Sequence, residues 1–181
     1  MEEYKLFLKK TPEGGKFQRV HAVLVTHDGR VLLRYKNGEA RITGGRIDEI
    51  DTNLEAALRR EVLEELNCEI DKVEYIGYLE AEIMDDDVRM KENWARMVAR
   101  VSKILPPKAD PDREGNWIYG RTLAPPEIAK AELMKSAPMG DTDRLIDYAP
   151  KIAREKEYFI EVPNVEYEVL NVESRDTEGW G

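Results

Sequence analysis

The chain is poor in cysteine and histidine, with one cysteine and two histidines in 181 residues. A lone cysteine, Cys68, cannot form a disulfide within the chain, so a reducing compartment such as the cytoplasm is the simplest expectation. Cys68 is expected to pack behind a helix. His21 and His27 lie too far apart along one strand to share a metal ion, and structural or surface roles are expected for both.

Long apolar runs are also missing. No segment approaches the ~20 apolar residues that span a bilayer, and the first ten residues, MEEYKLFLKK, do not read as a signal peptide. Hydrophobic residues make up 41% of the chain and charged residues 36%, which is typical of a globular protein in water. The length predicts a single domain over residues 1–181, with residues 106–181 as its variable C-terminal part.

The sequence has no excess of positive charge. Its net charge of −9 disfavours an extended nucleic-acid surface and binding to an anionic membrane. A small phosphorylated substrate is still compatible with this charge, because a divalent cation can reverse the sign of the potential at one site. The sequence is also compatible with a homodimer.

One strongly patterned stretch stands out, from Gly44 to Cys68. Four apolar residues in it recur at every fourth position and predict one buried stripe on a helix: Leu54, Leu58, Val62 and Leu66. Thr52 and Glu55 have the spacing of a capping box at the start of this helix. Asn67 is a candidate for a left-handed residue at its end.

Three glutamates share one side of this helix. Glu61, Glu64 and Glu65 have the spacing i, i+3 and i+4, and Glu65 falls inside the apolar arc. Like charges at these spacings destabilise a helix, and partial burial raises the cost unless a cation neutralises them. Mg²⁺ or Mn²⁺ suits such oxygens. The alternative is a solvated helix face on which Arg59 and Arg60 pair with the glutamates.

The same residues resemble the Nudix box, G-x5-E-x7-R-E-U-x-E-E-x-G-U, where U is a bulky aliphatic residue. The run from Arg60 to Glu65, REVLEE, matches the pattern residue for residue. If Gly45 is the glycine of the pattern, Asp51 takes the place of its first glutamate and one extra residue precedes Arg60. Counting back from Arg60 puts Thr52 at that place instead. An Asn-Cys pair replaces the final glycine and aliphatic residue.

Resemblance to the Nudix hydrolases implies an α+β fold, an α-β-α sandwich with a mixed sheet. It implies divalent-metal-dependent hydrolysis of a pyrophosphate linkage, in a nucleotide sugar, ADP-ribose, a dinucleoside polyphosphate or a nucleoside triphosphate. The cofactor would be Mg²⁺ or Mn²⁺. Two alternatives stay open: a non-catalytic Nudix-like module that binds a nucleotide or a protein, and a structural Glu-rich helix in an unrelated α+β protein.

The resemblance also implies roles for single residues. The metal ligands would be Glu61, Glu64, Glu65 and Gly45. Glu61 is the candidate general base, and Gly44 and Gly45 would let the backbone approach the ion and the phosphates. Arg60 is expected to point away from the ions and to brace the preceding loop through Asp51 or Asp48.

The rest of the chain reads as strands and turns up to about residue 104. Strands are predicted at 4–8, 19–26, 31–35, 39–43, 72–84 and 94–104, with turns at 28–29, 37–38 and 85–87 and a bulge at Gly77. The second of these strands has a nearly continuous apolar run, which predicts burial on both faces. Helices are predicted from Pro125-Pro126 to about Lys135 and from Asp141 or Thr142, with Pro150 as a kink or stop. Residues 158–172 read as a late strand or hairpin.

Two further features have a structural and a functional interpretation. Trp94, Arg96 and Arg100 share one face of a strand and would suit a base and a phosphate, although a half-exposed strand face explains them as well. The acidic loop at 110–115 resembles the start of a calcium loop. Its twelfth position is Arg121 instead of glutamate, which disfavours an EF-hand.

Overall fold

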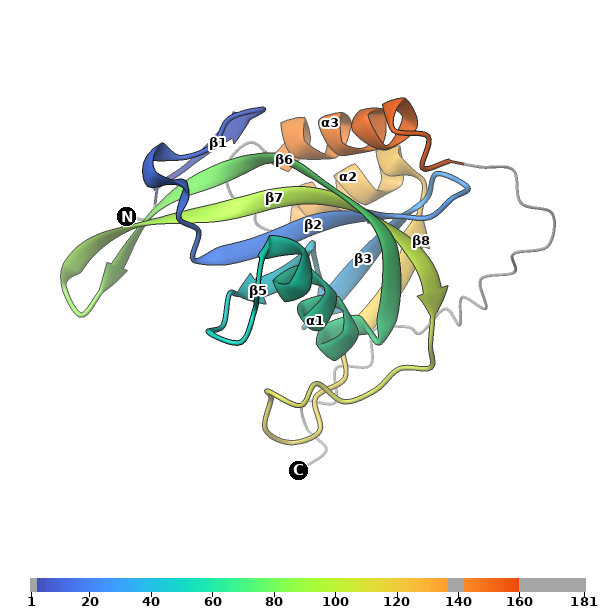
Figure 1. Cartoon of the computed structure of the whole chain (residues 1–181). Helices are drawn as coiled ribbons and strands as arrows, with labels where there is room; N and C mark the ends of the chain where they lie inside the picture. The colour runs from blue at the N-terminus through green and yellow to red at the C-terminus, as the bar shows by residue number, and fades with distance from the viewer. Residues whose placement is uncertain (1–2, 137–141, 160–181) are drawn as a thin grey trace.

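The computed structural model describes residues 3–136 and 142–159, which form one mixed sheet with helices on both faces (Figure 1). The strands are β1 (Glu3–Leu8), β2 (Arg19–Val25), β3 (Val31–Lys36), β4 (Glu39–Arg41), β5 (Thr43–Arg46), β6 (Cys68–Asp85), β7 (Val88–Ile104) and β8 (Gly120–Ala124). The helices are a 3-10 turn (Glu13–Gly15), α1 (Leu54–Leu66), α2 (Pro126–Lys135) and α3 (Thr142–Glu155).

The sheet divides beside its central strand, β2. The strand order is β1-β6-β7-β2-β3-β4, with β5 also paired to β2 and β8 to β3. β2 runs parallel to β7, while the other pairs are antiparallel. On its other side, the first half of β2 pairs with β5, where His21 lies opposite Gly44, and its end pairs with β3, where Leu24 lies opposite Leu32. The chain therefore leaves a gap between β5 and β3 next to β2.

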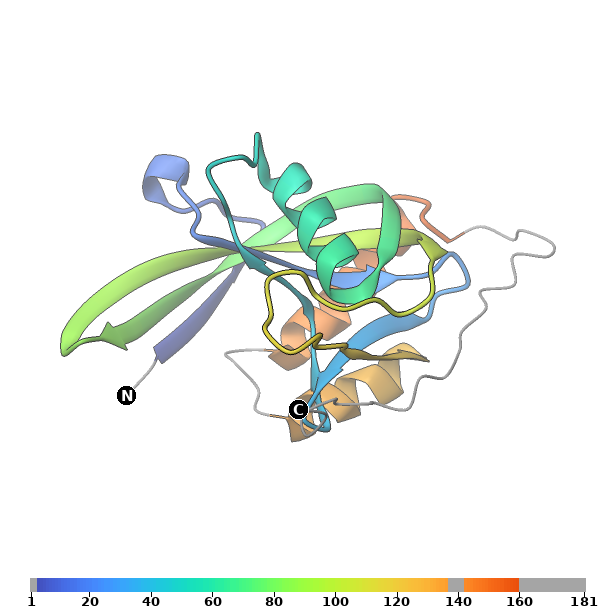
Figure 2. The same cartoon turned by 90° about the horizontal axis from the view of Figure 1, so that it is seen from below.

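Helix α1 covers one face of the sheet, and α2 and α3 cover the other (Figures 1 and 2). This arrangement confirms the predicted α-β-α sandwich with a mixed sheet. Alternate residues of β2 enter the two cores: Val23 and Val25 pack beneath α3, whereas Val20, Ala22 and Leu24 pack beneath α1. The prediction of burial on both faces of this strand is thus confirmed.

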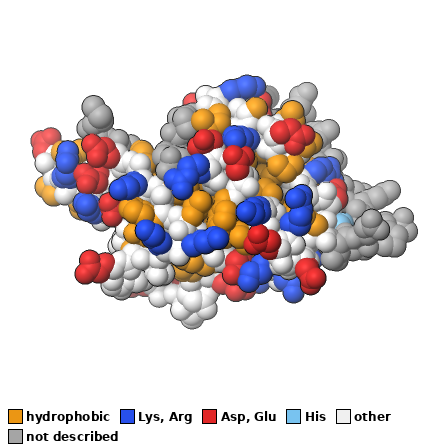
Figure 3. All heavy atoms as spheres, turned by 90° about the horizontal axis from the view of Figure 1, so that it is seen from above, with side chains coloured by type: hydrophobic (Ala, Val, Ile, Leu, Met, Phe, Trp, Pro, Cys, Tyr) orange, Lys and Arg blue, Asp and Glu red, His pale blue; other side chains and the backbone are white. Residues whose placement is uncertain are grey.

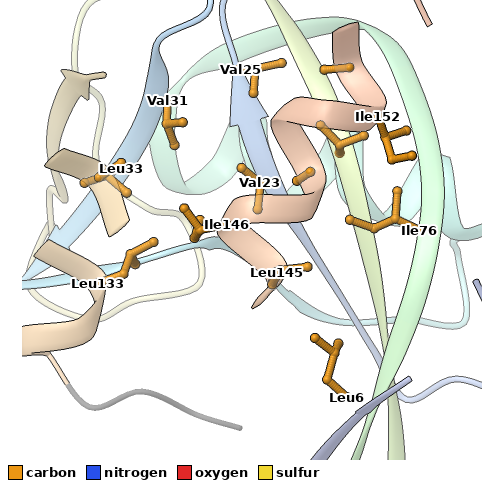
Figure 4. Packing of buried hydrophobic residues seen from close by; sticks show 14 of the residues in the cluster. Leu6, Val23, Val25, Val31, Leu33, Ile76, Leu133, Leu145, Ile146 and Ile152 are labelled. Atoms are coloured by element: carbon orange, nitrogen blue, oxygen red, sulfur yellow. The ribbon is translucent and has the colours of Figure 1, made fainter. Parts of the chain in front are cut away.

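Figure 4 shows the core between α3 and the sheet, where Leu145, Ile146 and Ile152 of the helix meet Val23 and Val25 of β2. Each of these side chains is buried.

The start of α1 differs by one residue from the prediction. Its N-cap is Asn53, not Thr52, and the Asn53 side chain accepts a 2.8 Å hydrogen bond from the amide of Ala56. No capping box forms, because the residue three positions after Asn53 is Ala56, and Glu55 instead pairs with Arg59 one turn along the helix. Asparagine is as good a cap as threonine, so a run of two possible caps leaves the boundary ambiguous by one residue.

The end of α1 agrees with the prediction. Asn67 is left-handed, with φ 49° and ψ 51°, and its amide donates a 3.0 Å hydrogen bond to the carbonyl of Leu63. Within the predicted stripe, Leu58, Val62 and Leu66 are buried and Leu54 is half-buried. Cys68 packs in the same core, as expected.

The later elements also test the sequence predictions. β1 is an edge strand, Asp86 and Asp87 are left-handed in the predicted turn, and Gly77 lies at an irregularity in the β6–β7 register. α2 has the predicted bounds. Pro150 does not stop α3, which runs through it to Glu155. Proline removes one backbone donor, and the buried side chains around it, including Ile146 and Ile152, hold the helix against the sheet nonetheless.

The surface seen from the α3 side carries charges of both signs, interspersed (Figure 3). Within the described ranges, no helix is long and apolar enough to cross a membrane. The late strand predicted at 158–172 falls outside the described residues from position 160 onward.

Candidate active site

Arg60 fastens the loop before α1 to the helix. Its Nε lies 3.1 Å from Asp51 Oδ1, its Nη2 lies 2.9 Å from Asp51 Oδ2, and Nη2 also donates to the carbonyl of Arg46 at 2.9 Å. These hydrogen bonds hold the pKa of Asp51 below its ordinary value. Of the two residues that the sequence offers at this place in the Nudix pattern, the structure pairs Asp51, and not Thr52, with Arg60.

Arg60 also contacts two of the predicted metal ligands. Its Nη1 donates to Glu61 Oε1 at 3.1 Å and to Glu64 Oε2 at 3.0 Å. The expectation that Arg60 points away from Glu61 is therefore wrong. Helical angles place Cβ atoms, but an arginine side chain is long enough to curl back over its own turn of helix. A single guanidinium thus connects the loop with two glutamates.

Gly44 and Gly45 each avoid a different steric clash. A Cβ on Gly45 would lie 2.5 Å from Glu61 Oε1, so this glycine makes room for the Glu61 carboxylate. Gly44 has φ 150°, and a Cβ there would lie 2.0 Å from the carbonyl oxygen of Val20. Gly44 therefore allows β5 to pass close to β2. Roles for either residue in binding an ion or phosphates remain predictions.

Glu65 is the most deeply buried of the three glutamates, with 7% of the residue exposed. Its Oε1 pairs with Arg34 and its Oε2 accepts a 3.2 Å hydrogen bond from the Gly44 amide. Burial raises the Glu65 pKa to about 7, against the opposing effect of Arg34. Burial also raises the pKa of Glu61 and of Glu64, against the opposing effect of Arg60.

A cavity of about 510 Å³ opens where the sheet divides. Six of the predicted site residues line it: Gly44, Gly45, Asp48, Arg60, Glu61 and Glu65. Asp51 and Glu64 are not part of its wall, but both accept hydrogen bonds from Arg60, which is. The geometry thus gathers the residues that the sequence singled out around one guanidinium and one cavity.

The sequence analysis missed several residues of the cavity. Asp110 and Asp112 belong to the loop between β7 and β8, which passes beside α1 (Figure 2). Asp110 is buried, and its charge contributes to the raised pKa of Glu61. The acidic loop was a visible signal, but only the folded chain shows which helix it approaches. The other missed residues are mostly arginines: Arg19, Arg34, Arg41, Arg46 and Arg113. Arg96, which the sequence offered as a candidate for binding a phosphate, also lines the cavity.

The strand face that carries Trp94 and Arg96 is buried, with 6% and 3% of these residues exposed. The interpretation as a half-exposed face is therefore wrong for both. The Trp94 ring lies against Arg19 and Arg96, with guanidinium carbons 5.0 and 5.8 Å from its centroid, and is packed instead of open to a base. Arg100 lies apart from them and binds Asp71 at 2.8 and 2.6 Å.

The acidic part of the cavity has donor chemistry that fits a hard divalent cation. The Glu61 carboxylate lies beside the Gly45 backbone, the charges of Glu64 and Asp110 contribute to the raised pKa of Glu61, and the charge of Asp110 contributes to the raised pKa of Glu64. A cation would relieve that repulsion. Within residues 3–136 and 142–159, no three such groups are set as ligands around one point, because Arg60 and Arg34 hold the glutamates. The ligand assignments stay predictions.

Comparison with known proteins agrees with this geometry. The sequence model described as the NUDIX domain matches residues 15–141. Among solved structures, a mutant of the Bacillus subtilis pyrophosphohydrolase BsRppH aligns with a TM-score of 0.60 and 14% identity over 83% of this chain and 90% of that one. A NUDIX hydrolase from Nitrosomonas europaea aligns with a TM-score of 0.52 and 16% identity, over 83% and 98%. No curated protein sequence matches significantly. The chain belongs to the NUDIX family, as its REVLEE segment predicted.

Proposed function

We propose that the protein hydrolyses a pyrophosphate linkage in a nucleoside diphosphate derivative, with Mg²⁺ or Mn²⁺ as its cofactor. One observation carries the proposal. Glu61 and the loop acid Asp110 approach one cavity whose remaining wall is rich in arginine. A site with carboxylates on one side and guanidinium groups on the other suits a metal-bound, multiply charged phosphate substrate.

Of the predicted ligands, Glu61 and Glu64 would hold the cation together with Asp110 of the β7–β8 loop, whereas the Glu65 carboxylate is bound by Arg34 and the Gly44 amide. When bound, the cation would screen the charge of the phosphates and favour a nucleophilic water. The predicted task of Glu61 is to accept the proton of the attacking water, which its raised pKa suits. Arg60 keeps Glu61, Glu64 and the Asp51 loop in one arrangement. Gly45 leaves the space that the Glu61 carboxylate occupies.

Backbone and arginine groups would position the substrate. Arg41 and Arg46 line the cavity near its mouth, where their side chains are part-exposed. Guanidinium groups bind phosphate oxygens in a bidentate manner and reduce the charge that repels an attacking water. The BsRppH neighbour is described as a pyrophosphohydrolase, which supports the same reaction class for this chain. A cytoplasmic location and a homodimer remain predictions from the sequence.

The test is a screen of nucleotide sugars, ADP-ribose, dinucleoside polyphosphates and nucleoside triphosphates with added Mg²⁺ or Mn²⁺. Released phosphate is measured after phosphatase treatment. We expect hydrolysis of at least one class, loss of that activity in EDTA and its return with the metal. A matched pair of variants assigns the site. Glu61→Gln should lose roughly 10²-fold or more in turnover, whereas Glu55→Gln, which changes an exposed carboxylate in the first turn of α1, should keep its activity. Full activity in chelator would contradict the metal dependence.

A further inference from the structure

Arg96 is a buried cation with no acidic partner in the described part of the chain. It is 3% exposed and lies on β7 in the cavity wall. Its hydrogen-bond partner among the described residues is His21, with Nη1 3.0 Å from Nδ1. Burial lowers the Arg96 pKa to about 9, so the guanidinium still carries its charge at neutral pH. A buried, unpaired charge costs folding free energy, which a bound anion would recover.

Two other arginines show how this protein normally compensates such a charge. Arg100, four residues further along β7, binds the carboxylate of Asp71 with two hydrogen bonds. Arg121 is also buried, and its Nη1 donates at 2.7 Å to the carbonyls of Leu66 and Leu105, at the C-terminal end of α1. Among the described residues Arg96 has neither kind of partner, only a neutral imidazole.

The neighbours of Arg96 present donors and positive charge to the same space. An arginine cannot accept a hydrogen bond, so Nδ1 of His21 is the acceptor and Nε2 of His21 carries the proton. Burial and the charges of Arg96, Arg34 and Arg19 lower the pKa of His21 and keep it neutral. Arg19 forms an ion pair with Glu92 and Arg34 forms one with Glu65, whereas no described acidic group pairs with Arg96.

The sheet register places Arg96 within reach of the proposed reaction centre. Arg96 on β7 pairs with His21 on β2, and His21 pairs with Gly44 on β5. Two strand spacings separate Arg96 from Gly44, a backbone distance of roughly 10 Å. Arg96, Gly45 and Glu61 also line the same cavity, so a group bound at Arg96 and a diphosphate beside Gly45 and Glu61 fit on one substrate molecule.

The chemistry of the wall selects the kind of group. Trp94, the aromatic residue of the cavity wall, has its ring against Arg19 and Arg96, so it does not offer a face for stacking a base. A planar guanidinium with a nearby imidazole N–H matches tetrahedral phosphate oxygens. We propose that Arg96, with Arg19, Arg34 and His21, forms an anion subsite for a phosphoryl group of the substrate beyond the linkage that is cleaved. The choice of phosphoryl over carboxylate rests on the proposed function.

The test measures binding without metal or turnover. The melting temperature of the full chain is followed in EDTA during titration with inorganic phosphate, with sodium acetate and sodium chloride as matched salts. We expect phosphate to stabilise the wild type in a saturable way, beyond the effect of either salt. Arg96→Met should weaken the apparent phosphate affinity by about tenfold or more, the loss expected for a charge-assisted hydrogen-bonding partner. Arg96→Lys keeps the charge but not the planar guanidinium, so its phosphate affinity should lie between those of the wild type and Arg96→Met.

Arg100→Met is the control, since it removes an equivalent arginine of β7 that has an acidic partner. It should lower the melting temperature without changing the response to phosphate, whereas ligand-free Arg96→Met should melt no lower than the wild type. A fall in melting temperature for Arg96→Met with an unchanged phosphate response would show a purely structural residue. Equal stabilisation by acetate would overturn the phosphoryl assignment. Because no catalysis is involved, a failed metal-dependent screen leaves this result unaffected.

Discussion

Asp51 and Arg60 form a bidentate ion pair between the loop after β5 and helix α1, with N–O distances of 3.1 and 2.9 Å. The Asp51 side chain is 4% exposed and that of Arg60 is 15% exposed, so solvent screens the pair weakly. The same guanidinium binds Glu61 and Glu64. The position of the loop and the position of the two carboxylates are therefore set by one side chain.

Changing Arg60 should separate positioning from binding. Arg60→Lys keeps the charge but cannot bind Asp51, Glu61 and the Arg46 carbonyl together. We expect turnover to fall by about tenfold or more, with little change in metal affinity. Asp51→Asn should cause a similar fall, and the double variant should be no worse than either single one. A large loss of metal affinity with unchanged turnover at saturating metal would contradict the positioning role.

Glu65 should make stability depend on pH in a defined window. Its pKa in the folded protein is about 7, raised from 4.5, so between these values the folded state binds more protons than the unfolded state. The contribution of Glu65 to the unfolding free energy should therefore fall as pH rises from about 4.5 to about 7, by about 3 kcal/mol at most. His21, whose pKa is lowered by burial, acts in the opposite direction at pH below about 6.5.

The difference between wild type and Glu65→Gln isolates the glutamate, because the other groups with shifted pKa values, His21, Glu61 and Glu64, are present in both. Urea unfolding at several pH values should show that the wild type loses stability relative to the variant as pH rises through the window. Glu55→Gln, which changes an exposed carboxylate of the same helix, should run parallel to the wild type. A constant difference between wild type and Glu65→Gln across the window would refute the raised pKa.

Local sequence patterns were sufficient to predict α1, because its signals lie within a few residues of one another. The stripe of Leu58, Val62 and Leu66 and the left-handed Asn67 were both predicted correctly. The N-cap was missed by one residue, since Thr52 and Asn53 are both good caps. The glutamate spacing likewise placed Glu65 inside the apolar face, where the structure has it.

The arginine-rich wall was not predictable in the same way, because it depends on which strands become neighbours. Arg96 and His21 are 75 positions apart and meet only through the parallel pairing of β2 and β7. Hydrophobic periodicity identifies a strand, but it does not fix its partner or register. The acidic loop was recognised as unusual, and its approach to α1 through Asp110 again required the tertiary fold.

The two glycines should respond differently to alanine. Gly44→Ala puts a Cβ against backbone atoms of β2 at a positive φ, so we expect a loss of several kcal/mol in unfolding free energy. Gly45→Ala meets the movable end of the Glu61 side chain, so stability should change by about 1 kcal/mol or less while turnover falls by about tenfold or more. Urea unfolding and the metal-dependent hydrolysis assay together check both. Equal destabilisation by the two variants would contradict this distinction.

Glu61→Gln should lower the turnover without lowering the stability of the folded protein. Burial raises the pKa of Glu61 even though Arg60 opposes it, which means that the folded protein disfavours the charged carboxylate. Glutamine keeps the size and polarity, so the melting temperature in EDTA should hold or rise slightly. The same change removes a proposed metal ligand and the candidate base, so turnover in Mg²⁺ should fall by roughly 10²-fold or more. If Glu61 serves only to pair with Arg60, the variant will melt at a lower temperature and hydrolyse at nearly the wild-type rate. Measuring both quantities on the one variant distinguishes a catalytic carboxylate from a structural one.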